Sequence, residues 1–204
     1  MIVPSRRDAV RPTPIARSKL LLVEGLSPAN FFEALCRHLG LSDAIEIRSY
    51  GGINQLHAYL RAQAAGEDFR RNVQSLLIAR DAEDDAVKAK QSVQTAIDAL
   101  KLHPSVRTQI AIFPNEVAAG MIETLCLSSV ADRPHYHCIH DFVVCIEGNG
   151  IRLPEGHKRD KHLAQMYLAT QEEAQLYPGI AAYRQAWPFD HVAFDRLRAM
   201  LANM

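Results

Sequence analysis

Four short apolar runs alternate with amphipathic segments in this 204-residue chain, and this alternation constrains the fold more than any other feature. The runs read as buried strands because they are continuous and rich in Leu, Ile and Val. Strands that alternate with helices over short connections form a parallel sheet with helices on its faces. We therefore expect an α/β fold. The expected strands are KLLLVEG at 19–25, AIEIRSY at 44–50, SLLIAR at 75–80 and TQIAIFP at 108–114.

Amphipathic segments lie between the strands. After the first strand, Ser27 is expected to cap a helix that has Pro28 at its first position and ends at Gly40. Helical spacing of apolar residues predicts two further helices, over residues 53–63 and 85–100. Each connection between successive strands therefore contains a helix, as a parallel sheet requires.

The rest of the chain shows helical spacing and no strand pattern. In residues 137–148, Ile139, Phe142, Val143 and Ile146 are expected to form one apolar stripe. The stretch LYPG, like GNGIRLPEGH, is expected to be a loop between helices. The sequence contains no internal repeat, so we expect one domain with a helical C-terminal portion. The expected boundaries are an extended N-terminal arm at 1–18 and a domain at 19–204, divided into a sheet core at 19–130 and a helical portion at 131–204.

Composition excludes some classes of protein. Lys plus Arg and Asp plus Glu both number 23, which argues against a strongly basic, non-specific nucleic-acid binder. No apolar stretch is long enough to span a membrane, and the first residues lack the apolar core of a secretory signal. We therefore expect a cytoplasmic protein. Four cysteines without a CxxC pair fit that compartment as reduced, buried thiols: Cys36, Cys126, Cys138 and Cys145.

Two other motifs have a functional and a structural reading. His135, His137, Cys138 and His140 include zinc-ligand types, but a structural zinc site needs paired ligands from two segments, so zinc is the less favoured reading. The stretch YGGINQL follows a strand and precedes a helix, where backbone N–H groups can meet an anion. A tight turn before a helix is the favoured reading there.

Acidic residues stand where two of the expected strands end. Glu24 ends the first strand, Asp81 ends the third, and Glu83 and Asp85 come next in RDAEDD. Ligands of open parallel sheets bind outside the carboxyl ends of the strands, so Glu24 and Asp81 are expected to face one edge. Clustered carboxylates resist ionisation, and a hard cation such as Mg²⁺ removes that penalty. The sequence therefore predicts a cation site here.

Helix capping is the alternative for the later acids of this run. Asp84 and Asp85 precede an expected helix, where an acidic side chain accepts hydrogen bonds from backbone N–H groups and favours the helix dipole. For these two residues both readings stay open. For Glu24 the capping reading is weaker, because Glu-Gly directly after a buried strand caps nothing obvious.

A set of short motifs follows one another in order after Lys19. The first strand ends in VEG, a helix follows, and the third strand ends in an acid-x-acid pattern at residues 81–83. The stretches are LLVEGLSPANFFEAL, YGGINQL, IARDAEDD, GMIETLCL, KHLAQMYLA and WPFDHVAFDRL. Together they resemble the Toprim domain of topoisomerases, primases and OLD-family nucleases, most closely a group of small bacterial proteins with a Toprim-like domain related to the OLD nucleases.

This resemblance implies a Toprim-like, Rossmann-like fold and a set of site residues. Glu24 matches the Toprim glutamate, a metal ligand or general acid/base. Asp81 and Glu83 match the acid-x-acid pair that binds metal. Glu123 resembles an additional metal-binding glutamate of OLD-type domains, and Lys161 resembles their lysine near the scissile phosphate.

The implied activity is Mg²⁺- or Mn²⁺-dependent hydrolysis of phosphodiester bonds in nucleic acid, within a defence system that includes a partner protein. Three positions depart from the family pattern: Pro28 replaces a frequent acid, Glu83 replaces an aspartate, and Leu26 replaces a frequent lysine. The alternative function is therefore a Toprim-like binding or regulatory module that keeps the fold without the chemistry.

Overall fold

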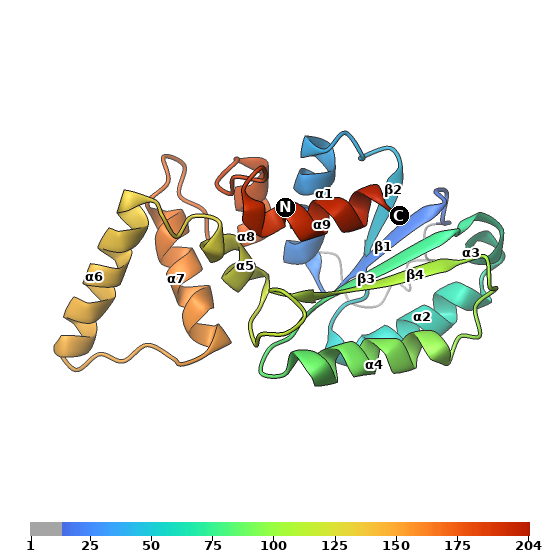
Figure 1. The fold of residues 1–204 in the computed structure, drawn as a ribbon, viewed down its shortest axis with the longest axis horizontal. Helices are drawn as coiled ribbons and strands as arrows, with labels where there is room; N and C mark the ends of the chain where they lie inside the picture. Colours follow the sequence, from blue (N-terminus) through green and yellow to red (C-terminus); the bar gives the residue numbers. More distant parts are fainter. Residues whose placement is uncertain (1–13) are drawn as a thin grey trace, which may run out of the picture.

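The computed structural model describes residues 14–204 and contains one parallel sheet (Figure 1). Its four strands are ordered β2-β1-β3-β4, and each pairs in parallel with its neighbours. This confirms the expected α/β fold. Residues 1–13 of the expected N-terminal arm lie outside the described residues. The strands are β1 (Lys19–Val23), β2 (Ile45–Ser49), β3 (Ser75–Asp81) and β4 (Arg107–Phe113).

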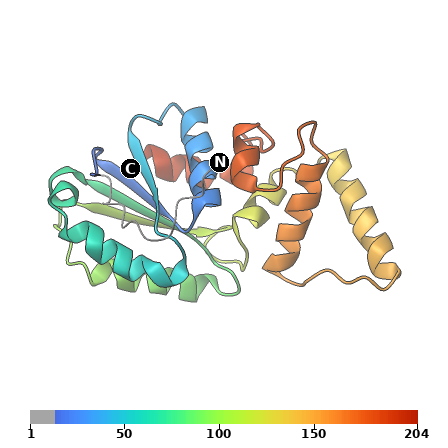
Figure 2. The same ribbon diagram turned by 180° about the vertical axis from the view of Figure 1, so that it is seen from behind.

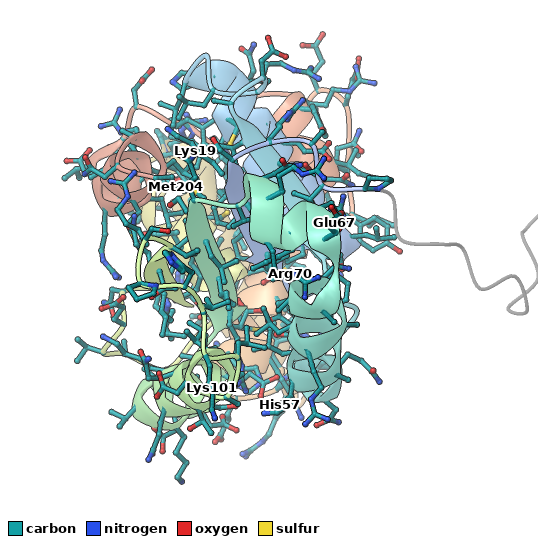
Figure 3. The ribbon with its side chains drawn as sticks, turned by 90° about the vertical axis from the view of Figure 1, so that its right-hand side faces the viewer. Lys19, His57, Glu67, Arg70, Lys101 and Met204 are labelled. Atoms are coloured by element: carbon teal, nitrogen blue, oxygen red, sulfur yellow. The ribbon has the colours of Figure 1, made fainter. Side chains whose placement is uncertain are left out.

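Side chains of the central strands alternate between two buried cores, one on each face of the sheet. Leu21 and Leu77 belong to the first core, whereas Leu22 and Ile78 belong to the second, and none of the four is exposed. Burial on both faces is the reason that these strands are continuously apolar. Figure 3 looks at the molecule from the end where Lys19 begins β1, with helices on either side of the sheet.

Helices cover both faces of the sheet (Figures 1 and 2). Helices α1 and α9 (Asp195–Ala202) contribute Phe31 and Leu201 to the first core. Helices α2 and α4 contribute Leu60 and Val93 to the second. The elements up to β4 are α1 (Leu26–His38), a 3₁₀ turn η1 (Ile53–Gln55), α2 (Leu56–Ala65), α3 (Glu67–Asn72) and α4 (Ala86–Asp98).

The C-terminal portion is helical, as expected, and α6 and α7 extend beyond the carboxyl end of the sheet (Figure 1). Its apolar residues continue the first core, in which Tyr167 stacks on Trp187 with ring centroids 5.4 Å apart. No helix of residues 14–204 has the length and apolarity needed to cross a membrane. The elements are α5 (Ile122–Ser128), α6 (Pro134–Gly148), α7 (His157–Ala169), α8 (Pro178–Tyr183), η2 (Val192–Phe194) and α9 (Asp195–Ala202).

Two expectations near α1 are wrong. The helix begins at Leu26 after Gly25, so Ser27 is not its cap. The Ser27 hydroxyl instead accepts a hydrogen bond of 3.3 Å from the backbone N–H of Gly179. The stretch LYPG is not wholly a loop, because Pro178 begins α8. Gly179 packs so closely on α1 that an added Cβ would lie 2.1 Å from the carbonyl oxygen of Ser27.

The apolar stripe expected on α6 is also only partly correct. Ile139 and Val143 are buried, but Phe142 is 53% exposed. The same side of the helix leaves Cys138 and Cys145 exposed, contrary to the expectation that all cysteines are buried. The helix packs on one side only, because it stands at the end of the molecule (Figure 1).

Thiol labelling should separate the four free cysteines into two pairs. We expect Cys138 and Cys145 to react rapidly with a thiol reagent at pH 8, because both are exposed. Cys36 and Cys126 should react only on unfolding. Burial raises the pKa of Cys36 to about 11 and that of Cys126 well above its usual range, so neither forms thiolate readily. Labelling kinetics with mass-spectrometric assignment, in native buffer and in denaturant, would contradict this if Cys126 reacted in the native protein.

Candidate functional site

The candidate site lies at the carboxyl edge of the sheet, between β1 and β3. These two strands are neighbours, and the chain leaves β1 for β2 on the opposite side. Such a reversal of strand order opens a crevice at the strand ends, where open parallel sheets bind ligands. Glu24 follows β1 directly, and Asp81 is the last residue of β3. The structure therefore brings the two expected acids to one edge.

Asp81 is fixed at this edge by the helix that follows β4. Its Oδ1 accepts a hydrogen bond of 2.8 Å from the backbone N–H of Ile122, the first residue of α5. Burial raises the pKa of Asp81 to about 7, and the charges of Glu123, Glu24 and Glu83 add to the rise, while the bond from Ile122 opposes it. The three other acids thus lie within electrostatic reach of this carboxylate.

Glu123 is brought beside Asp81 by the same helix. Its side chain is 6% exposed, and its Oε2 has no hydrogen-bond partner. Burial raises the pKa of Glu123, and the nearby charge of Lys161 lowers it in part. Glu123 and Lys161 line one small cavity of about 80 Å³, together with Gln165 and Tyr177. The predicted acid and the predicted lysine therefore meet at one place.

Two contacts hold α7, and with it Lys161, against this edge. The hydroxyl of Thr124 on α5 donates a 2.6 Å hydrogen bond to Oδ2 of Asp160. His157 Nδ1 lies 3.1 Å from Oδ1 of Asp84 in the loop after β3. Because both contacts come from the first turn of α7, they set the position of the lysine that follows.

The remaining predicted acids lie differently. Glu83 is exposed at the rim, with a left-handed φ of 53° and backbone hydrogen bonds to Gly120 in both directions. Asp85 is the N-cap of α4: its Oδ1 accepts from the backbone N–H of Lys88 at 2.9 Å, and its Oδ2 lies 3.2 Å from Nζ of Lys88. Both oxygens of Asp85 are engaged, so the structure gives this residue the capping role.

The acids lie within electrostatic reach of Asp81, but their oxygen atoms do not form a set of metal ligands. No group of three or more His, Cys, Asp or Glu side chains within residues 14–204 is arranged to hold a metal ion. The chemistry of the donors nevertheless fits a hard cation, because all are carboxylates and the buried Oε2 of Glu123 lacks a partner. Glu24, Asp81 and Glu123, with Glu83 at the rim, are the residues that could hold it.

Sequence reasoning missed two further polar residues at this edge. Arg80 is 8% exposed and Tyr50 is 3% exposed, and both carry side-chain atoms without hydrogen-bond partners. Burial raises the pKa of Tyr50, Glu24 raises it further, and Arg80 opposes the rise. The available signal was a single arginine inside a buried strand, a residue type that is almost never buried without a partner.

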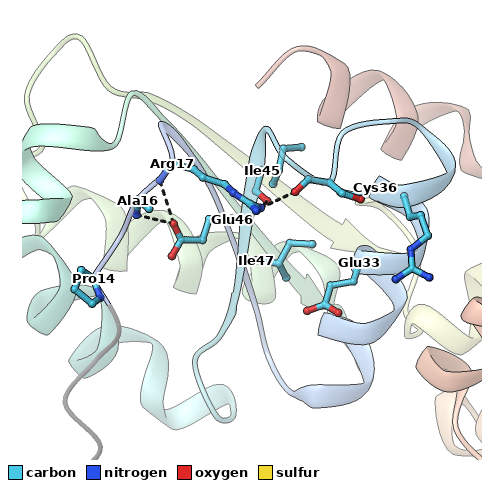
Figure 4. Close-up of a pocket in the computed structure, with 10 residues that line it drawn as sticks. Pro14, Ala16, Arg17, Glu33, Cys36, Ile45, Glu46 and Ile47 are labelled. Carbon is cyan, nitrogen blue, oxygen red and sulfur yellow. Dashed lines mark hydrogen bonds between the residues drawn. The ribbon is translucent and has the colours of Figure 1, made fainter.

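A larger cavity lies elsewhere and has a structural character. It has a volume of about 470 Å³ between α1 and the edge strand β2 (Figure 4). Nη1 of Arg17 donates to the carbonyl oxygens of Ser42 and Ile45, at 2.6 and 2.5 Å. Oε2 of Glu46 accepts from the backbone N–H groups of Ala16 and Arg17, at 2.9 and 3.2 Å. These charged groups are matched within the protein and hold the segment before β1 in place.

Comparisons with known proteins identify the family. Neither the curated proteins nor the solved structures gave a match. A family described as "Protein of unknown function (DUF3226)" matches residues 18–204, which include all four strands and the helical C-terminal portion. The chain therefore belongs to the DUF3226 family.

Proposed function

We propose that the carboxyl edge of the sheet is the site of a phosphodiesterase that cleaves nucleic acid with Mg²⁺ or Mn²⁺. The observation that carries the proposal is the state of Asp81, whose pKa rises to about 7 through burial and through the charges of three other acids. Perturbed acids at a strand edge are typical of functional sites. A divalent cation would reverse the penalty on the ionised form of every carboxylate in the group.

Each residue of the site has a distinct task in this proposal. Asp81 would bind the ion from the end of β3, Glu123 would bind it from α5, and Glu24 would bind it from the end of β1. Glu83 would reach in from the rim. When bound, the ion would polarise a phosphoryl oxygen and lower the pKa of a coordinated water.

Lys161 would act on the substrate. It is exposed, it lines the cavity that also contains Glu123, and Asp160 beside it is bonded to Thr124. An ammonium group held there can neutralise charge that develops on phosphoryl oxygens during cleavage. Because Lys161 and Glu123 line the same cavity, the ammonium group would stand next to the ion and not replace it.

A cleavage assay with a lysine variant tests this function. Wild-type protein should cut single- or double-stranded oligonucleotides with Mg²⁺ or Mn²⁺ and not with EDTA. Lys161→Ala should lower the rate by about 100-fold, the typical effect of removing one charge-stabilising group, and leave Mn²⁺ affinity within about threefold. Calorimetry would measure the affinity.

Lys158→Ala is the matched control, because Lys158 is an exposed lysine on the same helix. It should retain full activity. Equal losses of cleavage rate in Lys161→Ala and Lys158→Ala would show a general effect of removing positive charge. Absence of both cleavage and metal binding in the wild type would instead favour a binding module on this fold.

A further inference from the structure

Arg80 is a buried cation, and two of its three side-chain nitrogen atoms have no hydrogen-bond partner. Its Nε and Nη1 are covered from solvent and make no hydrogen bond, and among the ion pairs of residues 14–204 none includes Arg80. Burying a guanidinium in this way is costly unless an anion accompanies it. An unmatched buried arginine therefore points to a negatively charged ligand.

A second unmatched donor stands in the same row of the sheet. Ser49, Val23 and Ala79 pair across β2, β1 and β3. One residue further along these strands come Tyr50, Glu24 and Arg80. The phenol oxygen of Tyr50 is buried without a hydrogen-bond partner. Since Arg80 influences the pKa of Tyr50, the two donors lie within electrostatic reach of each other.

The segment after Tyr50 contains two glycines with open space beside them. Gly51 and Gly52 have φ values of 84° and 124°, and a Cβ added at either would meet nothing within 4 Å. Side chains are disfavoured at such φ values, so glycine keeps this side of the loop open and adaptable. Because the Arg80 and Tyr50 donors are covered in the structure, a ligand must displace neighbouring atoms to reach them.

We propose that Arg80 and Tyr50 form an anion subsite that takes a phosphate group, adjacent to the acidic cluster, with Glu24 of that cluster in the row between them. The guanidinium would offer two N–H donors to phosphate oxygens, the geometry in which arginine binds phosphate best, and the phenol would offer a third donor. This inference rests on the proposed function: the phosphate would neighbour the one that is cleaved. The edge would then bind a cation on the Asp81 side and an anion on the Arg80 side.

Binding measured without metal tests the subsite apart from catalysis. In EDTA, anisotropy of a labelled 8-mer oligonucleotide and ³¹P line broadening of inorganic phosphate would be recorded for wild type, Arg80→Met and Tyr50→Phe. We expect Arg80→Met to weaken binding by about 10- to 100-fold, the range for hydrogen bonds to a charged group, and Tyr50→Phe by about 3- to 10-fold. Arg61→Met, at an exposed arginine of α2, should change it by less than about twofold.

The outcomes separate the subsite from the proposed function. If the protein binds the oligonucleotide alone, the subsite takes a phosphodiester within a chain. If it also binds inorganic phosphate, the subsite takes a terminal or free phosphate. Both results support the subsite. Unchanged binding in Arg80→Met and Tyr50→Phe, or losses that Arg61→Met matches, would overturn it and leave Arg80 with a buried water. Tyr50→Phe, which removes one oxygen, decides the question if Arg80→Met does not fold. Failure of cleavage with phosphate binding intact would refute only the proposed function.

Discussion

Asp81→Asn is expected to abolish metal-dependent cleavage, with a loss of at least about 100-fold, since outer-shell changes at metal sites alone lose 10- to 100-fold. The amide keeps the size of the side chain, and its oxygen can still accept the hydrogen bond from Ile122. It removes the charge at the point where Glu24, Glu83 and Glu123 act together. Mn²⁺ affinity should fall with activity, whereas the metal-free fold should be retained. Cleavage assays and calorimetry measure the two effects.

Asp85→Asn is the control for this variant. It removes a carboxylate four residues away, but asparagine caps a helix as well as aspartate does, so α4 should keep its cap. Activity should stay within about twofold of wild type. A loss equal to that of Asp81→Asn would return Asp85 to the metal site, and activity that survives in Asp81→Asn would place the chemistry elsewhere.

The fold was predictable where burial decides the local structure. Continuous apolar runs indicate strands covered on both faces, and each of the four runs contains a strand. Helix α8 was missed because Pro178 and Gly179 read as a turn, whereas tight packing on α1 selects a helix there. Phe142 was predicted to be buried because it has the helical spacing of the apolar stripe on α6. Spacing alone does not show which apolar side chains of a helix pack against another element.

The site was predictable only in part. Glu24 and Asp81 could be placed together because the carboxyl ends of adjacent parallel strands meet at one edge. Glu123 and Lys161 come from later helices, so only the resemblance indicated them, and α5 and α7 bring them to one cavity. Asp85 stayed ambiguous because a helix start and a metal both favour an acid.

Stability should fall as the pH rises from 5 to 8 in the metal-free protein. The folded-state pKa of Asp81 is raised to about 7 from an ordinary value of 3.8. The folded protein therefore holds a proton that the unfolded chain releases, and ionisation favours unfolding. The stability that this group contributes is complete below 3.8 and lost by about pH 7. The expected decrease is on the order of 2 to 4 kcal/mol in the free energy of urea unfolding.

The difference between wild type and Asp81→Asn in the free energy of unfolding isolates this contribution. Every other titrating group is present in both proteins and, apart from the neighbours coupled to Asp81, titrates alike in both. The pKa values of Asp68 and Glu147 are lowered from 3.8 and 4.5, by hydrogen bonds from backbone Ile15 and from Arg159 respectively, so their contributions rise with pH only below those ordinary values and stay constant from pH 5 to 8. Asp81→Asn should therefore become the more stable protein above pH 7 and lose that advantage near pH 5. Mg²⁺ or Mn²⁺ should stabilise wild type at pH 8 far more than at pH 5, because the ion takes the place of the proton. Parallel unfolding curves for the two proteins across this range would contradict a buried, coupled carboxylate at position 81, and with it the physical basis for a cation at this edge.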